Sequence, residues 1–189
     1  MVDQVRAGMP LEAFEKLPDN AEYIDGEVVL MSPTKIGHSY LANLLADFLK
    51  DYVRPRQLGQ VLVEAAFAMV ESPDWVTGSR TPDVSFFAAD RWNAYVSERP
   101  NWQSAVFTLV PDLAVEIVSD NDDFAVVQRK AERYLEDGVR MVWVIEPSLK
   151  LIYVYEPNRP EILRVRESDL LRGGEVIAGF EVKAAQCFA

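Results

Sequence analysis

Residues 113–145 read LAVEIVSDNDDFAVVQRKAERYLEDGVRMVWVI and contain the patterns of a strand, a helix and a second strand in succession. The outer runs, Leu113 to Val118 and Met141 to Ile145, are almost continuously apolar and of strand length, which is typical of central strands covered on both faces. Between them, Asn121 to Asp137 has apolar side chains at helical spacing, and Gly138 follows at the usual left-handed cap position. A crossover of this length predicts that the two strands are parallel neighbours or near neighbours.

Two helices and a hairpin are predicted before this unit. Pro10 to Leu17 indicates a short helix with Pro at its first turn. His38 to Val53 follows the i, i+3, i+4, i+7 stripe of an amphipathic helix. Between these helices, Glu22 to Met31 forms two β-rich runs about Asp25-Gly26, a pair that favours a hairpin because a type I′ turn needs positive φ at both central residues.

Further strands are predicted from short β-branched or aromatic runs. They cover residues 61–70, 82–87, 149–155 and 162–165, with a last run at 180–182 after a turn at Gly173-Gly174. Residues 88–111 are predicted to form the longest irregular stretch, in which Trp92, Tyr95 and Trp102 cap the sheet or serve an interface. Together these elements predict an α/β (α+β) fold with a mixed sheet between helices.

Composition narrows the class of protein. The chain has 189 residues, of which 49% are hydrophobic and 26% charged, so a single globular domain is expected. The only cysteine, Cys187, excludes an intramolecular disulfide and a cysteine-based zinc site. No apolar run approaches the roughly 20 residues of a membrane span, and the acidic opening lacks the build of a signal peptide. We therefore expect a cytoplasmic protein without membrane contact.

The net charge is strongly negative, with 19 basic against 30 acidic residues and a balance of −11. This balance argues against a protein that coats nucleic acid generally, which needs Lys and Arg to neutralise phosphates. Any function on DNA must therefore be local. Basic residues gather at Arg54 and Arg56, at Arg80, at Arg91 and Arg99, and at Arg129, Lys130 and Arg133.

Two acidic residues lie where ordinary surface charges do not. Asp83 follows Pro82 at the start of a predicted strand, and Glu116 lies inside the apolar run 113–118. A carboxylate within a central apolar strand is costly unless it is paired, hydrogen-bonded or bound to a metal. A divalent cation shared with Asp83 meets this need, since hard oxygen ligands suit Mg²⁺ and leave it waters for catalysis.

Lys130 is the third candidate, and helical geometry places it. Viewed along the axis of the predicted helix over residues 121–137, Lys130 lies about 60° around the helix from Val127, at the border of the buried stripe. Its aliphatic stem can run along apolar surface and carry the ammonium toward the preceding strand, where Glu116 lies. A lysine there can orient or help deprotonate a water nucleophile and stabilise phosphate charge in the transition state.

Six strings of the sequence resemble the Uma-type family of restriction-endonuclease-like proteins, a branch of the PD-(D/E)XK nuclease superfamily. Three carry the core of the resemblance: TPDVSFF at 81–87, PDLAVEIVS at 111–119 and QRKAERYLEDGVRMVWVIEP at 128–147. The others are EYIDGEVVLMSP at 22–33, similar to the family's tyrosine-containing hairpin, HSYLANLLADFL at 38–49, similar to its histidine-led helix, and IAGFEVKAAQCF at 177–188, similar to its closing Gly-Phe segment. Each string is weak alone, but their order and spacing cover most of the chain and are specific together.

The resemblance implies Mg²⁺-dependent hydrolysis of DNA phosphodiester bonds, with Mn²⁺ as an alternative ion. By motif, Asp83 matches the Asp of the PD element and Glu116 the acidic residue of the (D/E)XK element, so both are implied as metal ligands. The lysine expected two residues after Glu116 is replaced by Val118. Lys130, as in the family, resembles a lysine that has migrated to the following helix. Gln128, Tyr134 and His38 also match family positions and are implied as supporting residues.

The resemblance also implies the organisation of the chain. We expect one restriction-endonuclease-like domain over residues 1–189 with an αβββαβ core. Residues 1–35 would supply an N-terminal helix and hairpin extension, residues 36–156 the nuclease core, and residues 157–189 the C-terminal strands. A homodimer is the simplest way to supply two sites for cleavage of both DNA strands.

Each candidate residue also has an ordinary structural explanation. Asp83 could be a turn residue at strand entry, Glu116 could pair with Lys130 without a metal, and Lys130 alone would be a solvated helix lysine. His38, the only histidine, could be a surface residue at a helix start. Glu64 could face the same cleft or point outward, because side chains alternate along a strand.

Two functions follow from different classes of protein. The first is a metal-dependent endonuclease. The second is a catalytically inactive protein of the nuclease fold that acts as a regulatory or protein-interaction module, favoured by the net charge of −11. The sequence does not indicate other common enzyme classes, because the chain has no G-x-S-x-G, P-loop, H-E-x-x-H or G-x-G-x-x-G motif.

Overall fold

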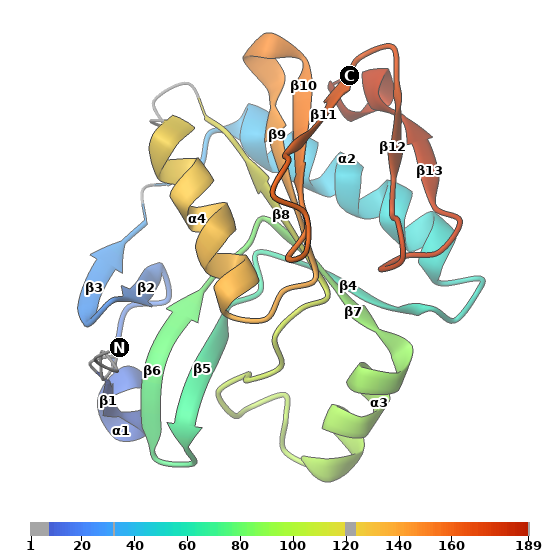
Figure 1. Ribbon diagram of the computed structural model, residues 1–189. Helices are drawn as coiled ribbons and strands as arrows, with labels where there is room; N and C mark the ends of the chain where they lie inside the picture. Colours follow the sequence, from blue (N-terminus) through green and yellow to red (C-terminus); the bar gives the residue numbers. More distant parts are fainter. Residues whose placement is uncertain (1–7, 32, 120–123, 189) are drawn as a thin grey trace.

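A mixed sheet with helices on both faces forms the centre of the protein (Figure 1). The computed structural model describes residues 8–31, 33–119 and 124–188. In these residues the central sheet has six strands in the order β11-β10-β9-β8-β7-β4. Their bounds are β4 Gly59–Val63, β7 Val84–Ala88, β8 Leu113–Ile117, β9 Met141–Glu146, β10 Leu151–Tyr155 and β11 Leu163–Arg166. As predicted, β8 and β9 are parallel neighbours, whereas the other pairs in this sheet are antiparallel.

Helices α2 (Ile36–Val53) and α4 (Phe124–Glu136) cover opposite faces of this sheet (Figure 1). The alternation of side chains along β8 explains the division. Leu113, Val115 and Ile117 pack into the core that contains α2, while Ala114 packs into the core that contains α4. The succession α2, β4, β7, β8, α4, β9 reproduces the predicted αβββαβ order, with further elements inserted after β4 and after β7.

The helix of the strand–helix–strand unit agrees with the sequence pattern where it is described. Residues 121–123, the predicted beginning, lie outside the described residues. From Phe124 to Glu136 the chain is helical, and Gly138 has a φ of 102°, the left-handed conformation that ends the helix. Every residue of β8 and β9 is buried, as their apolar sequences predict.

The N-terminal hairpin also matches its prediction. Strands β2 (Ala21–Ile24) and β3 (Glu27–Leu30) pair antiparallel about Asp25 and Gly26, whose φ angles are 51° and 90°. Positive φ at both central residues is the requirement of a type I′ turn. The hairpin is held to the rest of the protein through Tyr23, whose N–H donates a 2.8 Å hydrogen bond to Ser79 Oγ.

One predicted strand is wrong as a single element. Residues 61–70 contain the end of β4 and the start of β5 (Phe67–Ser72), because Glu64 has a φ of 49° and breaks the extended chain. The strand β6 (Trp75–Arg80), which the sequence analysis does not predict, pairs with β5 and with β1 (Met9–Pro10) in a second sheet.

The irregular stretch predicted over residues 88–111 is also wrong, since it contains the helix α3 (Ala89–Glu98). Trp92 packs with Phe87 at the end of β7 and with Trp102, at ring-centroid distances of 5.7 and 5.2 Å. Tyr95 packs with Phe107 at 5.0 Å. These aromatic side chains therefore pack together against α3, and Phe107 connects them to the core that contains α4.

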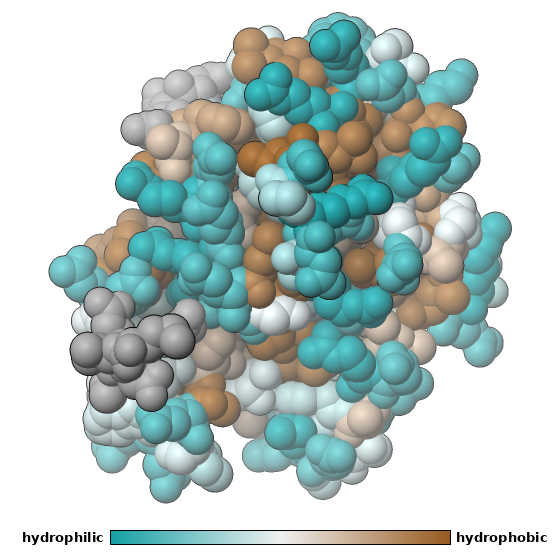
Figure 2. Space-filling view, viewed as in Figure 1, coloured by the Kyte–Doolittle hydropathy of each residue, from teal (hydrophilic) through white to brown (hydrophobic). Residues whose placement is uncertain are grey.

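The remaining elements complete the two faces. A single turn of helix, α1 (Leu11–Phe14), is shorter than the predicted Pro10 to Leu17. The strands β12 (Leu170–Arg172) and β13 (Glu181–Lys183) and the 3₁₀ turns Pro147–Leu149 and Ala184–Phe188 follow β9 in the chain. Figure 2 shows hydrophilic residues along the exposed side of α4 and hydrophobic ones reaching the surface between α4 and β11. No described helix combines the length and apolar character needed to span a bilayer.

Candidate active site

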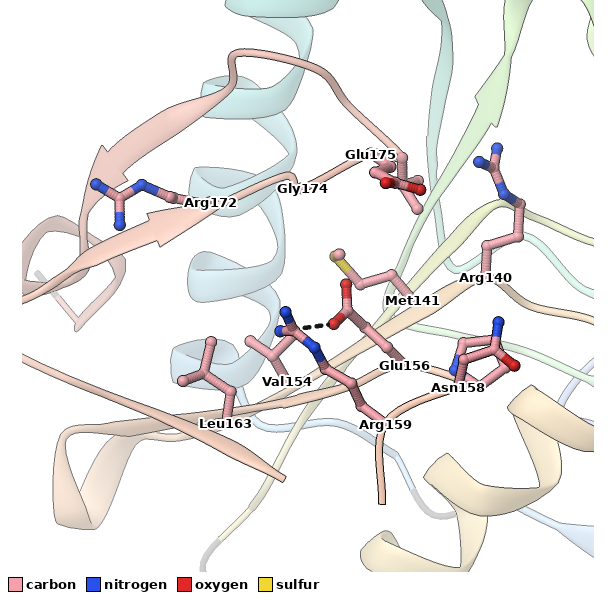
Figure 3. A pocket seen from close by; sticks show the side chains of 12 residues that line it. Arg140, Met141, Val154, Glu156, Asn158, Arg159, Leu163, Arg172, Gly174 and Glu175 are labelled. Carbon is pink, nitrogen blue, oxygen red and sulfur yellow. Dashed lines mark ion pairs between the residues drawn. The ribbon is translucent and has the colours of Figure 1, made fainter. Parts of the chain in front are cut away.

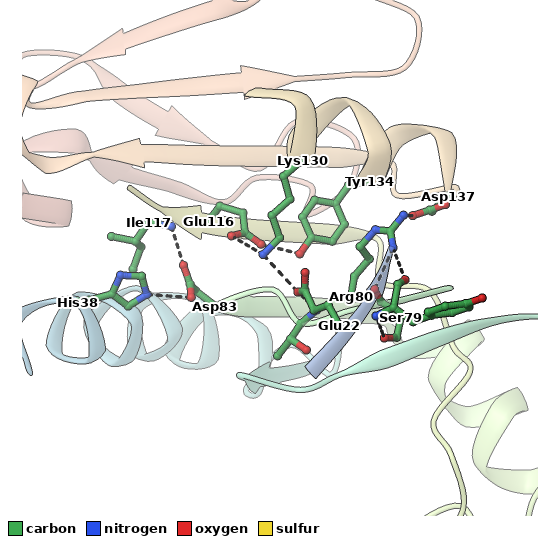
Figure 4. A network of polar contacts seen from close by, with 12 residues as sticks. Glu22, His38, Ser79, Arg80, Asp83, Glu116, Ile117, Lys130, Tyr134 and Asp137 are labelled. Carbon is green, nitrogen blue, oxygen red and sulfur yellow. Dashed lines mark hydrogen bonds and ion pairs between the residues drawn. The ribbon is translucent and has the colours of Figure 1, made fainter. Parts of the chain in front are cut away.

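Asp83 and Glu116 are brought together by the antiparallel pairing of β7 with β8. The register sets Val84 opposite Val115, so Asp83 lies opposite Glu116 one step further along. Asp83 Oδ2 accepts a 2.6 Å hydrogen bond from the N–H of Ile117, which fixes its carboxylate at the end of β8. Both acids line one hollow of about 390 Å³, which we call the acidic hollow. Figure 4 shows their contacts.

Lys130 reaches the same place from α4, as its position at the border of the buried stripe predicts. Its Nζ lies 3.1 Å from Glu116 Oε2 and 3.3 Å from Glu22 Oε1. One turn further along the helix, the Tyr134 hydroxyl donates a 2.5 Å hydrogen bond to Glu116 Oε1. Both oxygens of Glu116 therefore have a partner on α4, which explains how a carboxylate is accommodated inside an apolar strand.

Glu22 belongs to this cluster and is not among the residues predicted from the sequence. It lies on β2, has only 1% of its surface exposed, and accepts a 2.7 Å hydrogen bond from the N–H of Thr81. The signal was present, because Glu22 stands in a β-rich run just as Glu116 does. The hairpin pattern nevertheless does not say which of its acids turns inward, since that depends on the packing of β2 against β6.

The electrostatics of the cluster follow from burial and from the surplus of acids. Burial, with Asp83 and Glu22 adding to it, raises the pKa of Glu116 from 4.5 to about 7 even though Lys130 and Tyr134 act to lower it. For Lys130, burial opposes the charge, but Glu116 and Glu22 more than offset this and raise its pKa above the usual value. Lys130 therefore stays an ammonium at neutral pH, while Glu116 is close to its titration point.

His38 is also brought to the acidic hollow. Its Nε2 lies 2.9 Å from Asp83 Oδ1, and its side chain is largely buried where α2 begins. Because Ile117 holds Oδ2 and His38 holds Oδ1, the orientation of the Asp83 carboxylate is fixed at both ends. The surface explanation of His38 is therefore wrong.

Known proteins can now be compared with this arrangement. The family model described as "Uma2: Putative restriction endonuclease" matches residues 11–185. The chain belongs to the Uma2 family. Among solved structures, it is similar to "a putative nuclease belonging to DUF820 from Anabaena variabilis", with 21% sequence identity and a TM-score of 0.77. That match covers 95% of this chain and 97% of the other, and it supports the restriction-endonuclease-like fold. No curated protein matches the chain.

Two further candidates of this Uma2 chain do not join the site. Gln128 lines a different hollow, because two residues along a helix turn it by about 200° from Lys130 to the opposite flank of α4. Glu64 is exposed in the break between β4 and β5 and does not line the acidic hollow, although its N–H donates a 3.0 Å hydrogen bond to the Asp83 carbonyl. Strand alternation could not place Glu64, since the strand ends at this point.

Several of the arginines noted in the sequence serve the fold instead of a ligand. Arg80 is buried, and its guanidinium pairs with Asp137 at 3.1 Å and donates to the Tyr23 carbonyl (Figure 4). Arg91 and Arg140 both pair with the buried carboxylate of Asp112, at 3.0 and 3.2 Å. Each of these arginines therefore already has an acidic partner within the fold.

A second hollow, larger than the acidic one, is drawn in Figure 3. It has a volume of about 680 Å³, and we call it the arginine hollow after Arg140, Arg159 and Arg172 in its wall. Each of these guanidinium groups has an acidic partner, which is Asp112, Glu156 and Glu181 respectively. Size alone therefore does not make this hollow the stronger candidate.

The donor set of the acidic hollow fits a hard divalent cation. Two carboxylates, those of Asp83 and Glu116, line the hollow together with His38, Lys35 and Lys130, and buried Glu22 contacts Lys130 from β2 behind the lining. Among the described residues no group of three or more His, Cys, Asp or Glu forms a ready metal cage. The pair of carboxylates, Asp83 and Glu116, suits Mg²⁺, which is commonly held by one or two carboxylates together with waters and substrate phosphate.

Proposed function

We propose that this Uma2 chain is a Mg²⁺-dependent endonuclease that hydrolyses phosphodiester bonds in DNA. The convergence of two carboxylates, Asp83 and Glu116, and one ammonium, that of Lys130, on one hollow carries the proposal. Oxygen ligands for a metal beside a cation for phosphate are the parts that metal-assisted phosphoryl transfer requires. Membership of a family described as restriction endonucleases supports the same reaction class.

Each residue has a role that its contacts suggest. Asp83 and Glu116 would hold the metal, which when bound lowers the pKa of a coordinated water and polarises the phosphate. Lys130 would position the water nucleophile and stabilise the negative charge that develops on phosphate. Tyr134 positions Glu116 through its 2.5 Å hydrogen bond, and His38 positions Asp83.

The departure from the family pattern at Val118 is consistent with this assignment. A lysine at position 118 would extend from the end of strand β8, two residues beyond Glu116, whereas Lys130 extends from helix α4. Its ammonium nonetheless lies 3.1 Å from Glu116 Oε2. A migrated lysine can therefore serve the same carboxylate from another element, because geometry and not sequence position decides the role.

The proposal is tested by metal titration and a nuclease assay on the same protein. We expect calorimetry to detect Mg²⁺ and Mn²⁺ binding that is lost in Asp83→Asn and Glu116→Gln, together with metal-dependent cleavage of plasmid and oligonucleotide DNA. Glu64→Gln is the matched control, because Glu64 is an exposed acid near Asp83 that does not line the hollow. Cleavage that persists in either ligand variant, or in the presence of a chelator, would reject the assignment.

One observation favours a second candidate, a nuclease fold without activity that acts as an interaction module. The ammonium of Lys130 already contacts both Glu116 and Glu22. These two carboxylates therefore have a counter-charge without a metal. The net charge of −11 also works against DNA binding. If neither Mg²⁺ nor Mn²⁺ binds and no DNA is cleaved, this second function replaces the first.

The proposal extends to assembly and organisation. A homodimer would supply two active sites for cleavage of both strands of a duplex, and sedimentation equilibrium would detect it. We also propose that residues 1–35, 36–156 and 157–189 act as one domain. A single cooperative unfolding transition is the expected result, whereas separate transitions would divide the chain.

A further inference from the structure

A hollow of about 380 Å³ lies on the other flank of α4, between that helix and the strands β10 and β11. We call it the aromatic hollow. Phe124 and Gln128 line it from α4, Tyr153 and Tyr155 from β10, and Arg164 from β11. The active site proposed above uses none of these five side chains, and Gln128, which the family resemblance implies as a supporting residue, lines this hollow instead.

The wall of this hollow is built from flat rings. The rings of Phe124 and Tyr153 lie 4.9 Å apart at an interplanar angle of 51°. The guanidinium of Arg164 lies 6.0 Å from the centre of the Tyr153 ring. Aromatic rings beside an exposed arginine are the groups that hold a nucleobase by stacking and its phosphate by charge.

One residue that lines the hollow, Tyr155, carries a hydroxyl for which the described residues supply no partner. Tyr155 is only 5% exposed, and among the described residues its buried hydroxyl forms no hydrogen bond. A buried polar atom without a partner is costly, so it points to a ligand or a water that completes it. Burial, together with nearby Glu132, raises the pKa of Tyr155 to about 12, and the group is therefore a protonated donor at neutral pH.

The sheet sets the separation between this hollow and the acidic one. Glu116 on β8 pairs with Val144 on β9, and Val144 pairs with Tyr153 on β10. The three residues therefore share one level of the sheet, about 10 Å from first to last at a strand spacing of 4.8 Å. This distance is measured along the sheet beneath α4, so a single strand that passes over the helix, which is about 10–12 Å across with its side chains, follows a longer path between the two hollows.

Helix α4 stands between the two hollows, because it contacts β8, β9 and β10. Lys130 and Gln128 lie on its opposite flanks. A rigid duplex cannot enter both hollows around a helix, whereas a single strand can bend across it with one base turned out of its stack. The geometry therefore favours an unpaired segment over a duplex.

The charges of the neighbourhood give the bound nucleotide a direction. The aromatic hollow continues, through Tyr155, into a smaller one of about 190 Å³ that contains Glu132, Glu156 and Glu161 together with one cation, Arg159, which pairs with Glu156. Phosphate is repelled from that acidic end and attracted to Arg164, which lies at the other.

We propose that the aromatic hollow binds one unstacked nucleobase of a single-stranded segment of the nucleic-acid substrate, with the adjoining phosphate at Arg164. The base stacks on Phe124 and Tyr153, and its polar edge meets the Gln128 amide and the Tyr155 hydroxyl. The proposal rests on the nuclease function for the statement that the ligand is part of a substrate.

The test uses dAMP as probe and deoxyribose 5-phosphate as the matching ligand without a base. Both are titrated into the full chain and followed by saturation-transfer NMR and calorimetry. The variants are Gln128→Leu, Tyr155→Phe and Arg164→Gln. Arg129→Gln and Arg166→Gln are the matched controls, since both arginines are exposed on the same elements and do not line the hollow.

We expect dAMP to bind more tightly than the sugar phosphate. Each of the three variants should raise the dissociation constant for dAMP about three- to tenfold. Only Arg164→Gln should weaken the sugar phosphate, and the controls should match wild type. Tyr155→Phe removes a single oxygen, so it stays informative if a larger change impairs folding. Equal binding of the two probes, or variants that bind dAMP like wild type, would overturn the inference.

Cleavage assays separate this inference from the nuclease proposal. The three variants should raise KM for single-stranded oligonucleotides about tenfold with kcat little changed, whereas Asp83→Asn should abolish cleavage and leave dAMP binding intact. Binding of dAMP without any cleavage would sink the nuclease and keep the base site. Cleavage with unaltered KM in all three variants would do the reverse.

Discussion

The acidic hollow and the arginine hollow both contain acids and bases, yet their charges are balanced in different ways. In the arginine hollow, Arg159 pairs with Glu156 and Arg172 with Glu181, and most of these groups are well exposed to water. Each cation there has an acidic partner, and Arg140 shares its partner Asp112 with Arg91. A ligand must first separate such a pair, which leaves this larger hollow with little reason to bind anything.

The acidic hollow has the opposite balance. Buried Glu22 and Glu116 share the ammonium of Lys130, and Asp83 contacts His38 and the N–H of Ile117, while Lys35 lines the exposed part of the same hollow. An additional cation would lower the energy of such a cluster, because the low dielectric of the interior strengthens every charge interaction. Unbalanced buried charge therefore marks a site better than the volume of the hollow does.

The largest effect should come from removing a proposed metal ligand. Asp83→Asn or Glu116→Gln keeps the shape of the side chain and removes its charge, so we expect cleavage of DNA to fall by about a thousandfold or more. Quantitative gel assays at saturating Mg²⁺ measure this loss. Matching losses in Arg159→Ala, which belongs to the arginine hollow, would show that the comparison is wrong.

Removing the shared ammonium should destabilise the fold itself. Lys130→Met leaves Glu22 and Glu116 buried without their cation, and we expect a loss of about 3–5 kcal/mol in the free energy of unfolding at pH 8. Because burial raises the pKa of Glu116 from 4.5 to about 7, its protonation favours the folded protein, and this contribution is lost as the pH rises through 7.

The destabilisation by Lys130→Met should therefore shrink as the pH is lowered from 8 to 5, where Glu116 takes up a proton. Urea unfolding at both pH values measures the difference. A penalty that is the same at pH 5 and pH 8 would mean that Lys130 does not neutralise Glu116.

Metal binding should stabilise the protein in a way that depends on pH. At a Mg²⁺ concentration one hundred times the dissociation constant, the gain is about 2.7 kcal/mol. We expect this gain at pH 8 and a smaller one at pH 6, because Mg²⁺ needs the ionised form of Glu116, whose pKa is about 7. Thermal unfolding with and without Mg²⁺ measures it, and a stabilisation retained in Glu116→Gln would place the ion elsewhere.

The sequence predicts the centre of the fold well because the pattern there is dictated locally. The apolar runs of β8 and β9 and the stripe of α4 each require burial on a known side, and a crossover of that length permits few topologies. The prediction fails at β5, β6 and α3. Glu64 ends strand β4 through a positive φ, which the local sequence pattern does not predict. Helix α3 is stabilised by aromatic contacts that form only in the folded protein.

The site divides in the same way. Helical spacing places Lys130 toward Glu116 from the sequence alone, whereas the role of Tyr134 was implied by the family resemblance. Glu22 could not be predicted from the sequence, because its contact with Lys130 depends on how the hairpin packs against β6. Gln128 was misplaced because family position was followed where the helical angle pointed to the opposite flank.

Removing the hydroxyl of Tyr134 tests a smaller contribution to the acidic hollow. Tyr134→Phe takes one donor from Glu116 Oε1 and keeps the ring, so we expect a loss of about 2 kcal/mol in stability. Cleavage should fall about ten- to a hundredfold, since Tyr134 orients a ligand without touching the metal. An unchanged rate would show that the orientation of Glu116 is set by Lys130 alone.

The smallest effect is expected in the arginine hollow, and it sharpens the comparison from the other side. Arg159→Ala and Arg172→Ala each break an ion pair in which the arginine is more than half exposed. Pairs of this kind contribute less than about 1 kcal/mol, because water and salt screen them. We expect urea midpoints close to wild type, equal cleavage, and little change between low and high salt. A loss as large as that of Lys130→Met would mean that balanced, exposed charges can matter as much as unbalanced, buried ones, and charge balance would then no longer distinguish the two hollows.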